Sequence, residues 1–237
     1  MNIKDQAQKN LAVFKSKKYH GRCLIQGMSE AGDFIQIYIV EGRSLISKDR
    51  FIVENGSKIE TRAIYPEKVL DPSLIIYTAM NDRYDIHVVS NGHQTDNILK
   101  HYTSGQVLNG KDFEYEPDPS HTPRITGIID SVKKTAEILI FKKSPFGSGC
   151  ERQLYRYEDF YPGYGHCITT YNDDGDPLPS FTGEPYLLPL NGTAKEIAQE
   201  IWDSLNEENR VSLVIKTIGK GRGGKINTMI INKYQAV

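Results

Sequence analysis

Short runs of apolar and aromatic residues follow one another along this chain in adjacent pairs, and turn-forming residues separate the members of each pair. Residues 22–28 and 34–40 flank a Ser-Glu-Ala-Gly-Asp stretch, and residues 51–54 and 58–64 flank Asn55-Gly56, a dipeptide typical of tight hairpins. Further strands are predicted over residues 86–90, 125–129, 136–142, 153–157, 167–171, 211–218 and 226–232. Because the strands do not alternate with helices, the pattern disfavours a parallel βαβ sheet and predicts an α+β fold with mostly antiparallel sheets.

A few segments carry the apolar spacing of helices and would cover these sheets. Residues 3–16 place apolar side chains at helical intervals between charged ones, and residues 93–102 also look helical. Thr193 with Glu196 three residues later forms the pattern of a capping box, so we predict a capped helix over residues 194–205.

The length of 237 residues allows one large domain or two small ones. The chain shows no internal repeat, and residues 144–185, although rich in Pro and Gly, hold too many Tyr and Phe for a flexible linker. We therefore expect one domain over residues 1–237, with residues 1–18 as an N-terminal helical extension.

Charge and composition disfavour several classes of protein. The formal net charge of -1 lacks the basic excess that nucleic-acid-binding proteins usually carry. No apolar run is long enough to span a bilayer, and the polar first residues resemble no secretory signal, so we expect a cytoplasmic protein. The cysteines, Cys23, Cys150 and Cys167, are odd in number and widely spaced, and we interpret them as reduced thiols.

Some apparent motifs fail on their chemistry. The glycine-rich residues 219–225 resemble a phosphate-binding P-loop, but Ile226 stands where Ser or Thr would hold magnesium, so a hairpin turn is favoured. Residues 172–176 resemble part of a calcium loop without its first and last acidic ligands. The histidines show no metal-binding spacing, and no processing site exposes a nucleophile as an N-terminal residue.

Polar groups are dense in several predicted turns beside strand ends. Residues 42–50 hold arginines and hydroxyls that fit either an anion cradle or a solvated loop. Residues 90–96 join a strand to a helix, which fits either a phosphate site or an ordinary helix start. Residues 114–125 form a proline-stiffened loop with acids, a Thr and an Arg, and residues 19–22 and 162–185 add further polar turns.

Together these stretches resemble the archaeal-type IMP cyclohydrolases. The resemblance rests on YHGR at 19–22, GRS…R at 42–50, DPSLIIY at 71–77, SNGHQTD at 90–96, YEPD…TPRI at 115–125, and PGYG…TTY with PSFTGEP at 162–185. It implies a four-layer αββα sandwich like that of the N-terminal nucleophile hydrolases, without their nucleophile. It also implies closure of 5-formamidoimidazole-4-carboxamide ribotide (FAICAR) to IMP with loss of water, without a metal or an organic cofactor.

The reaction requires a base for the carboxamide nitrogen, a donor for the developing oxyanion, and an acid for the leaving oxygen. By position in the matching motifs, the resemblance implies Glu116 as acid or base, Tyr77 as oxyanion donor or proton relay, and Arg43 as the group that polarises the carboxamide or formyl oxygen. The implied substrate-binding residues are Arg22, Ser44, Arg50, Asn91, Thr122 and Arg124.

Several alternatives stay open at this stage. Arg50 and Arg124 also fit salt-bridged scaffold residues, and Tyr77 fits a core aromatic residue. The sequence does not decide which of Glu114, Glu116 and Asp118 faces the ligand. Alternative functions are a non-catalytic purine-nucleotide-binding protein and an amide-acting hydrolase that uses a related ribotide on the same fold. The predicted partner is a small purine ribotide rather than a nucleic acid or a membrane, and a homo-oligomer stays open.

Overall fold

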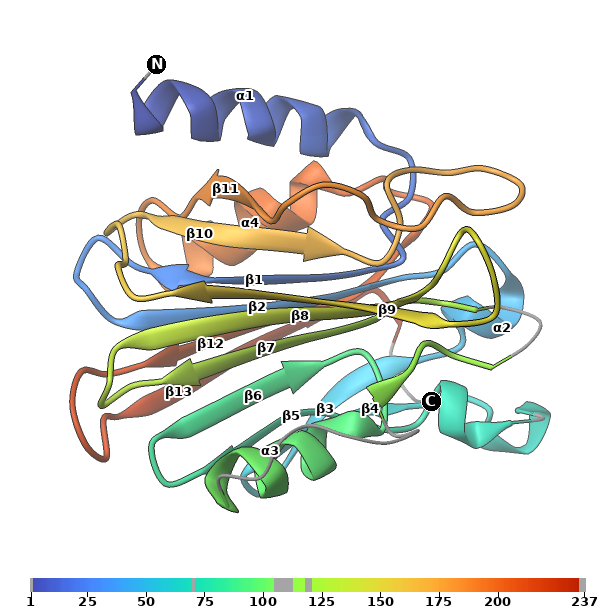
Figure 1. The fold of residues 1–237 in the computed structure, drawn as a ribbon, viewed down its shortest axis with the longest axis horizontal. Helices are drawn as coiled ribbons and strands as arrows, with labels where there is room; N and C mark the ends of the chain where they lie inside the picture. Colours follow the sequence, from blue (N-terminus) through green and yellow to red (C-terminus); the bar gives the residue numbers. More distant parts are fainter. Residues whose placement is uncertain (1, 70, 105–112, 118–120, 235–237) are drawn as a thin grey trace.

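The computed structural model describes residues 2–69, 71–104, 113–117 and 121–234 (Figure 1). Within these residues the strands form two antiparallel sheets, with the orders β11-β10-β1-β2-β12-β13 and β3-β4-β5-β6-β7-β8-β9. The first sheet contains β1 (Arg22–Met28), β2 (Phe34–Glu41), β10 (Tyr164–Thr169), β11 (Tyr186–Pro189), β12 (Arg210–Ile218) and β13 (Ile226–Asn232). The second sheet contains β3 (Phe51–Asn55), β4 (Lys58–Arg62), β5 (Thr78–Arg83), β6 (Ile86–Ser90), β7 (Arg124–Asp130), β8 (Thr135–Lys143) and β9 (Cys150–Tyr157).

Helices cover the outer face of each sheet. α1 (Ile3–Ser16) packs on β11 and α4 (Ala194–Ser204) on β12, whereas α3 (Gln94–Ser104) packs on β5 and β6. Between the sheets, β1 contacts β7 and β2 contacts β6. The layers therefore follow the order helix, sheet, sheet, helix, with α1 and α3 at opposite sides of the molecule (Figure 1). The short α2 (Leu45–Lys48), η1 (Pro66–Lys68) and η2 (Pro72–Leu74) lie in connections between strands.

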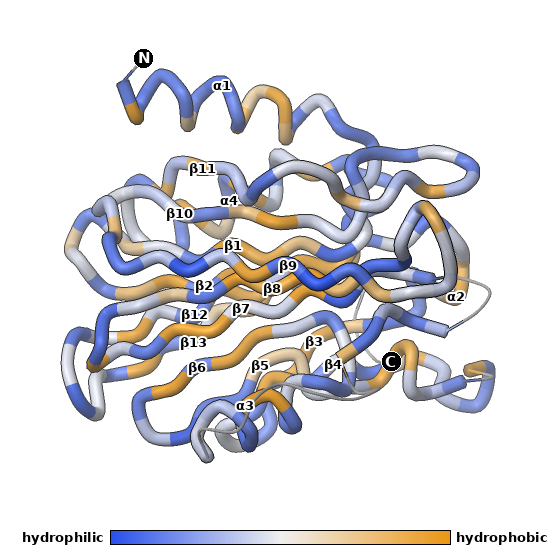
Figure 2. The backbone as a smooth tube through the Cα atoms, viewed as in Figure 1, coloured by the Kyte–Doolittle hydropathy of each residue, from blue (hydrophilic) through white to orange (hydrophobic). Residues whose placement is uncertain are grey.

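Apolar side chains fill the spaces between these layers, because alternate residues of a strand point to opposite faces of its sheet. Leu24, Tyr38 and Ile138 belong to the cluster between the two sheets. Cys23 and Ile25, which alternate with Leu24 on β1, lie instead in the cluster beneath α1 and α4. In Figure 2 apolar residues recur along many of the strands, and hydrophilic residues are frequent at their connections.

A polar cluster interrupts the apolar layer between the sheets. Lys216 of β12 is 2% exposed, and its Nζ donates to Asp82 Oδ1 of β5 at 2.5 Å. The same Asp82 oxygen lies 3.0 Å from Nδ1 of His87 on β6, and Gln36 of β2 donates to the His87 carbonyl at 3.0 Å. Burial alone would raise the pKa of Asp82, but Lys216 and His87 lower it below its ordinary value. These bonds connect the two sheets to each other.

The secondary structure confirms most of the predicted elements. The helix predicted over 3–16 is α1, and the strand predicted over 22–28 is β1. Thr193 and Glu196 form both bonds of the predicted capping box at the start of α4. The glycine-rich residues 219–225 form the turn between β12 and β13, which pair as a hairpin. None of the described helices is both long and apolar enough to cross a membrane.

Other predicted boundaries are wrong, and some elements were not predicted. The strand predicted over 167–171 begins at Tyr164 and ends at Thr169, because the chain turns into a loop at Thr170. The strand predicted over 153–157 begins at Cys150, where it extends its ladder with β8. The sequence patterns also missed β5, β11 and the single turn of α2.

Candidate active site

Polar side chains gather at one end of the two-sheet sandwich, where several strands begin or end. Arg22 opens β1, Tyr77 precedes β5, Asn91 follows β6, Arg124 opens β7 and Tyr171 follows β10. Because β1 pairs antiparallel with β10, and β6 with β7, the start of one strand lies beside the end of its partner. The polar turns predicted from the sequence therefore meet at this end of the fold.

The turn at residues 19–22 is anchored by a buried pair on the α1 side of the sheet. Glu41 Oε2 accepts from His20 N at 2.6 Å and lies 3.0 Å from His20 Nδ1, and neither side chain is exposed. Gly21 has a φ of +74°, and a Cβ atom at this position would collide with Thr170 and Tyr171. The glycine thus lets Arg22 enter β1 in close contact with the end of β10.

Arg22, Tyr38, Arg50 and Tyr77 form a compact cluster between the sheets. The hydroxyl oxygens of Tyr38 and Tyr77 lie 2.7 Å apart. Burial alone would raise the pKa of Tyr77, but the neighbouring Arg22 and Arg50 and the bond with Tyr38 lower it below its ordinary value. Burial, and next the negative charge that Tyr77 can carry, raises the pKa of Tyr38. The two phenols therefore differ in acidity although they share a hydrogen bond.

The cluster carries positive charge without a matching carboxylate. Arg50 is 3% exposed; its Nε donates to the Ser47 carbonyl at 2.8 Å, and its Nη1 has no hydrogen-bond partner among the described residues. Arg22 Nη1 donates to the Glu41 carbonyl at 3.1 Å, whereas its Nε has no hydrogen-bond partner in the part of the chain that the structure describes. Burial, and next the charge of Arg22, lowers the pKa of Arg50 to about 10. Among the described residues neither guanidinium forms an ion pair with a carboxylate, so this cluster favours an anionic ligand.

A buried ion pair lies in the second part of the site. Glu116 Oε1 is 3.1 Å from Arg124 Nη1, with the side chains 9% and 3% exposed. Arg124 also donates to the Asn91 carbonyl at 3.0 Å. The Asn91 side chain accepts from Ile125 N and donates to the Pro123 carbonyl, both at 2.8 Å. Asn91 therefore holds the loop that presents Glu116 and Arg124.

The other acids of this loop differ from Glu116 in position. Glu114 is 45% exposed and lies 3.6 Å from Arg152 on β9. Asp118 lies outside the described residues. Of the acids that the structure describes in this loop, Glu116 is therefore the buried one.

Tyr171 joins the arginine–tyrosine cluster to the Glu116–Arg124 pair. Its hydroxyl donates to Thr122 Oγ1 at 2.9 Å, and its ring stacks on Tyr19 at 5.9 Å between centroids. Burial raises the pKa of Tyr171. The charge of Arg22 lowers this pKa and the charge of Glu116 raises it, so both groups influence the hydroxyl. The two groups of residues therefore belong to one continuous site.

Arg43 and Ser44 lie at the rim rather than in the buried part of the site. Arg43 Nη1 contacts Asp174 Oδ1 at 2.5 Å and the Gly175 carbonyl at 2.9 Å, and its guanidinium lies over the Tyr19 ring. Ser44 is exposed and caps α2. The role of Arg43 in polarising a substrate stays a prediction, and it requires the guanidinium to leave Asp174.

Sequence reasoning missed Tyr38, Tyr171 and Lys142. Tyr38 looked like an ordinary core residue of a buried strand, and Tyr171 stood in a quoted motif without a role. Lys142 shares the inner face of β8 with Ile138 and is 8% exposed, and its Nζ donates to the Phe181 carbonyl at 3.1 Å. The sequence could have indicated Lys142, because it occupies a position in the strand at which the alternating residues are apolar and point inward.

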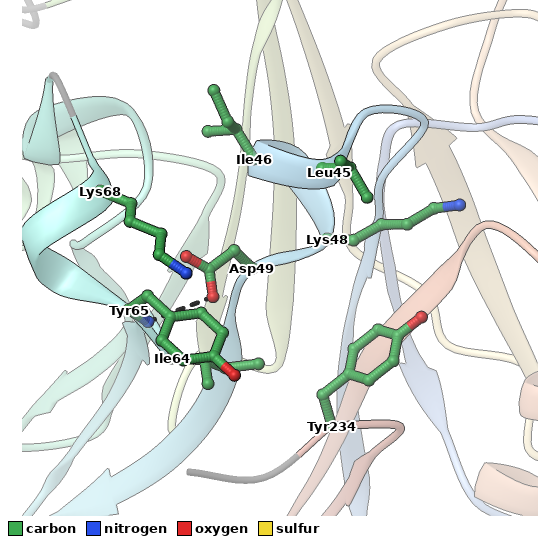
Figure 3. A pocket seen from close by; sticks show the side chains of 8 residues that line it. All are labelled: Leu45, Ile46, Lys48, Asp49, Ile64, Tyr65, Lys68 and Tyr234. Atoms are coloured by element: carbon green, nitrogen blue, oxygen red, sulfur yellow. Dashed lines mark hydrogen bonds between the residues drawn. The ribbon is translucent and has the colours of Figure 1, made fainter. Parts of the chain in front are cut away.

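A separate groove of about 420 Å³ lies beside α2 (Figure 3). It is lined by Leu45, Ile46, Lys48, Asp49, Ile64, Tyr65, Lys68 and Tyr234. Asp49 Oδ1 accepts from the Tyr65 amide, and Lys68 Nζ lies 3.9 Å from the centroid of the Tyr65 ring. None of the residues predicted for the site lines this mostly apolar groove, so we place the candidate active site between the sheets instead.

The donor set of the site suits proton transfer and anion binding. It offers guanidinium groups, phenols and a buried carboxylate. In the part of the chain that the structure describes, no three His, Cys, Asp or Glu side chains gather in a way that could hold a metal ion. A reaction without metal or cofactor stays a prediction.

The fold and the candidate site describe a class: an α+β protein with a cluster of arginine and tyrosine side chains between two packed antiparallel sheets. A family model described as "IMP cyclohydrolase-like protein" matches residues 19–222, and the chain belongs to this family. A protein named IMP cyclohydrolase from Methanothrix thermoacetophila is 32% identical over 118 residues, which are 47% of this chain and 57% of that protein. The match thus spans little more than half the length of this archaeal relative.

Proposed function

We propose that this chain is a cyclohydrolase that closes FAICAR to IMP with loss of water, the last step of de novo purine synthesis. Family membership supports the proposal, as does the name of the archaeal relative. The observation that carries it is the juxtaposition of Arg22 and Arg50, which have no carboxylate partner within the described residues, with a tyrosine pair and a buried glutamate. A phosphorylated substrate with a developing oxyanion would supply the negative charge that this cluster lacks.

Ring closure moves two protons from nitrogen to oxygen. The carboxamide nitrogen bonds to the formyl carbon and loses one proton, and the former formamido nitrogen loses the other as its double bond to that carbon forms. Both protons end on the former formyl oxygen, which leaves as water. The site therefore needs groups that accept a proton and return it, and Glu116 and Tyr77 are the groups that we assign to this exchange.

The remaining residues would bind and orient the ribotide. We assign Arg22 and Arg50 to anionic groups of the substrate, and Arg124 to the orientation of Glu116 through their ion pair. Asn91 and Thr122 would act by holding the loop and Tyr171, since their side chains already bond to these parts of the protein. Arg43 and Ser44 would contact the substrate from the rim.

Finer statements belong to the same proposal. The helix–sheet–sheet–helix order supports a fold like that of the N-terminal nucleophile hydrolases, formed as one domain. The net charge of -1 supports a small-molecule partner rather than a nucleic acid. We further propose a cytoplasmic enzyme that works without metal or cofactor, and leave homo-oligomer formation to a measurement of solution mass.

The proposal is tested by following IMP formation from FAICAR with the purified chain in the presence of a metal chelator. We expect turnover above the spontaneous rate, and a loss of about 100- to 10,000-fold in kcat for Glu116→Gln with IMP binding retained. Glu114→Gln is the matched control, because this exposed acid lies in the same loop and pairs with Arg152. Equal activity of wild type and Glu116→Gln would contradict the role of Glu116.

The same experiment separates the alternative functions. A non-catalytic nucleotide-binding protein would bind IMP in calorimetry and show no turnover. An amide-acting hydrolase would consume a related ribotide and release ammonia or formate rather than form IMP. Either result would replace the cyclohydrolase proposal.

A further inference from the structure

The Tyr38–Tyr77 hydrogen bond is buried, and it joins strands of one sheet to a loop of the other. Tyr38 lies on β2 with no exposed surface, and Tyr77, 5% exposed, directly precedes β5. Their oxygens are 2.7 Å apart, so one hydroxyl donates and the other accepts. Whichever oxygen accepts is free to hold negative charge or to take a proton from a ligand.

The charged groups around the pair distinguish its two oxygens. Arg22 from β1 and Arg50 from the connection after α2 both favour negative charge on Tyr77. The same cations act on Tyr38, but its burial and the charge of Tyr77 keep it protonated. Tyr19, which lies in the segment before β1, acts through its charge to raise the pKa of both arginines. Tyr38 has no exposed surface, whereas Tyr77 is 5% exposed at a strand end, so Tyr77 is the oxygen that a ligand can reach. The pair therefore suits Tyr38 as the donor and Tyr77 as the acceptor.

We propose that Tyr38 is a positioning residue that makes Tyr77 the base of the reaction. By donating its hydroxyl hydrogen, Tyr38 leaves the Tyr77 oxygen as an acceptor, close enough to Arg22 and Arg50 to feel their charge. This inference rests on the proposed cyclohydrolase function and assigns the proton acceptor within it.

The bond changes follow from this geometry. The lone pair of the carboxamide nitrogen forms the bond to the formyl carbon, and the C=O π electrons move onto the formyl oxygen. The N–H proton passes to the ionised oxygen of Tyr77, which then returns it to the former formyl oxygen; the C–O bond breaks, and that oxygen leaves as water. Glu116, held by Arg124, takes and returns the second proton, so the enzyme ends in its starting state.

A spectroscopic titration of the full chain tests the pair without any substrate. In the wild type, the tyrosinate absorbance should show one hydroxyl that ionises at a lower pH than those of the other tyrosines. Tyr77→Phe should abolish this transition. Tyr38→Phe should raise it by about one pH unit, because a donor to the phenolate is lost. Tyr84→Phe is the control, since Tyr84 is 82% exposed and should leave the transition unchanged.

Kinetics with FAICAR extend the test. In Tyr38→Phe the acidic limb of the kcat/KM profile, which reports groups of the free enzyme, should move upward in pH with the titration, whereas KM at pH values above this limb should change little. Arg50→Gln removes a positive charge near Tyr77 without removing a phenol, and it should also raise the pH at which Tyr77 ionises. This variant keeps the proposal testable if Tyr38→Phe fails to fold.

The outcomes separate this inference from the function on which it rests. Persistence of the early transition in Tyr77→Phe would overturn the tyrosine pair. An unchanged transition in a folded Tyr38→Phe, or in Arg50→Gln if Tyr38→Phe does not fold, would overturn it as well. An acidic limb of kcat/KM that stays in place while the transition moves would overturn Tyr77 as the base. Absence of FAICAR turnover in a wild type with the expected titration would overturn the cyclohydrolase proposal, and with it the base assignment, but would leave the pair intact.

Discussion

Replacement of Asp82 by Asn should strongly destabilise the fold, although Asp82 lies outside the candidate active site. The substitution leaves Lys216 in place, 2% exposed, without the carboxylate that balances its charge. Removal of one member of a buried ion pair costs about 3–5 kcal/mol. Because Asp82 is 14% exposed and His87 stays nearby, we expect the lower end, about 3 kcal/mol, or a Tm lower by about 6–12 °C for a chain of this size.

Lys216→Met should cost less, because it removes the buried charge and leaves Asp82 with His87. The double variant Asp82→Asn/Lys216→Met should be more stable than the sum of the single changes predicts, by about 2 kcal/mol. Lys133→Met is the control, since it breaks a lysine–aspartate pair whose lysine is 68% exposed. Urea unfolding followed by circular dichroism measures all of these variants at one pH.

The pH dependence gives the sign of the effect. In the wild type the lowered pKa of Asp82 contributes stability above the ordinary aspartate pKa of about 4, and this contribution is lost as the pH falls through the lower folded value. In Asp82→Asn, burial lowers the pKa of Lys216 with no carboxylate to oppose it. The unfolded chain then binds more protons, so the stability of this variant should rise with pH toward about 10. A cost below about 1 kcal/mol with no such pH dependence would refute the argument.

Other changes test the geometry of the site. Gly92→Ala should keep the fold but reduce kcat/KM about 10- to 100-fold, because a Cβ atom there would displace the Arg124 guanidinium; urea unfolding beside kinetics separates the two effects. If Arg43 moves from Asp174 to the ligand, Asp174→Asn should tighten IMP binding and Arg43→Ala should weaken it. A change of the IMP dissociation constant in the same direction in both variants, measured by calorimetry, would contradict this. A thiol reagent should modify Cys150 alone in the native protein, since the other cysteines are fully buried, and peptide mass spectrometry identifies the modified residue.

The strands were predictable where apolar residues alternate or continue between turn signals, as in β1 and β2. β5 escaped prediction because its Asn81 and Asp82 make it look like a polar loop. In the structure these side chains find partners on other elements, as Asn81 does with Asp96 on α3 at 2.6 Å. A pattern along one segment cannot show that a polar residue is satisfied by a distant one.

The site was predictable only as separate polar stretches. The resemblance placed Glu116 and Arg124 in one loop, and the structure shows them as an ion pair. Tyr38 was missed because its hydroxyl partner lies 39 residues away in the other half of the sandwich. The contact of Arg43 with Asp174 spans 131 residues and joins two loops that no periodicity connects. Whether these residues act on a ribotide stays a prediction.

The division of the site between the two sheets has a consequence for how the protein acquires its activity during folding. Arg22 and Tyr38 belong to one sheet, whereas Tyr77 and Arg124 lie at the strand ends of the other. A folding intermediate that contained either sheet alone would lack half of the binding groups. The ability to bind a ligand should therefore appear only when the two sheets pack together. In a refolding experiment, the recovery of IMP binding, measured by fluorescence competition, should lag behind the recovery of secondary structure.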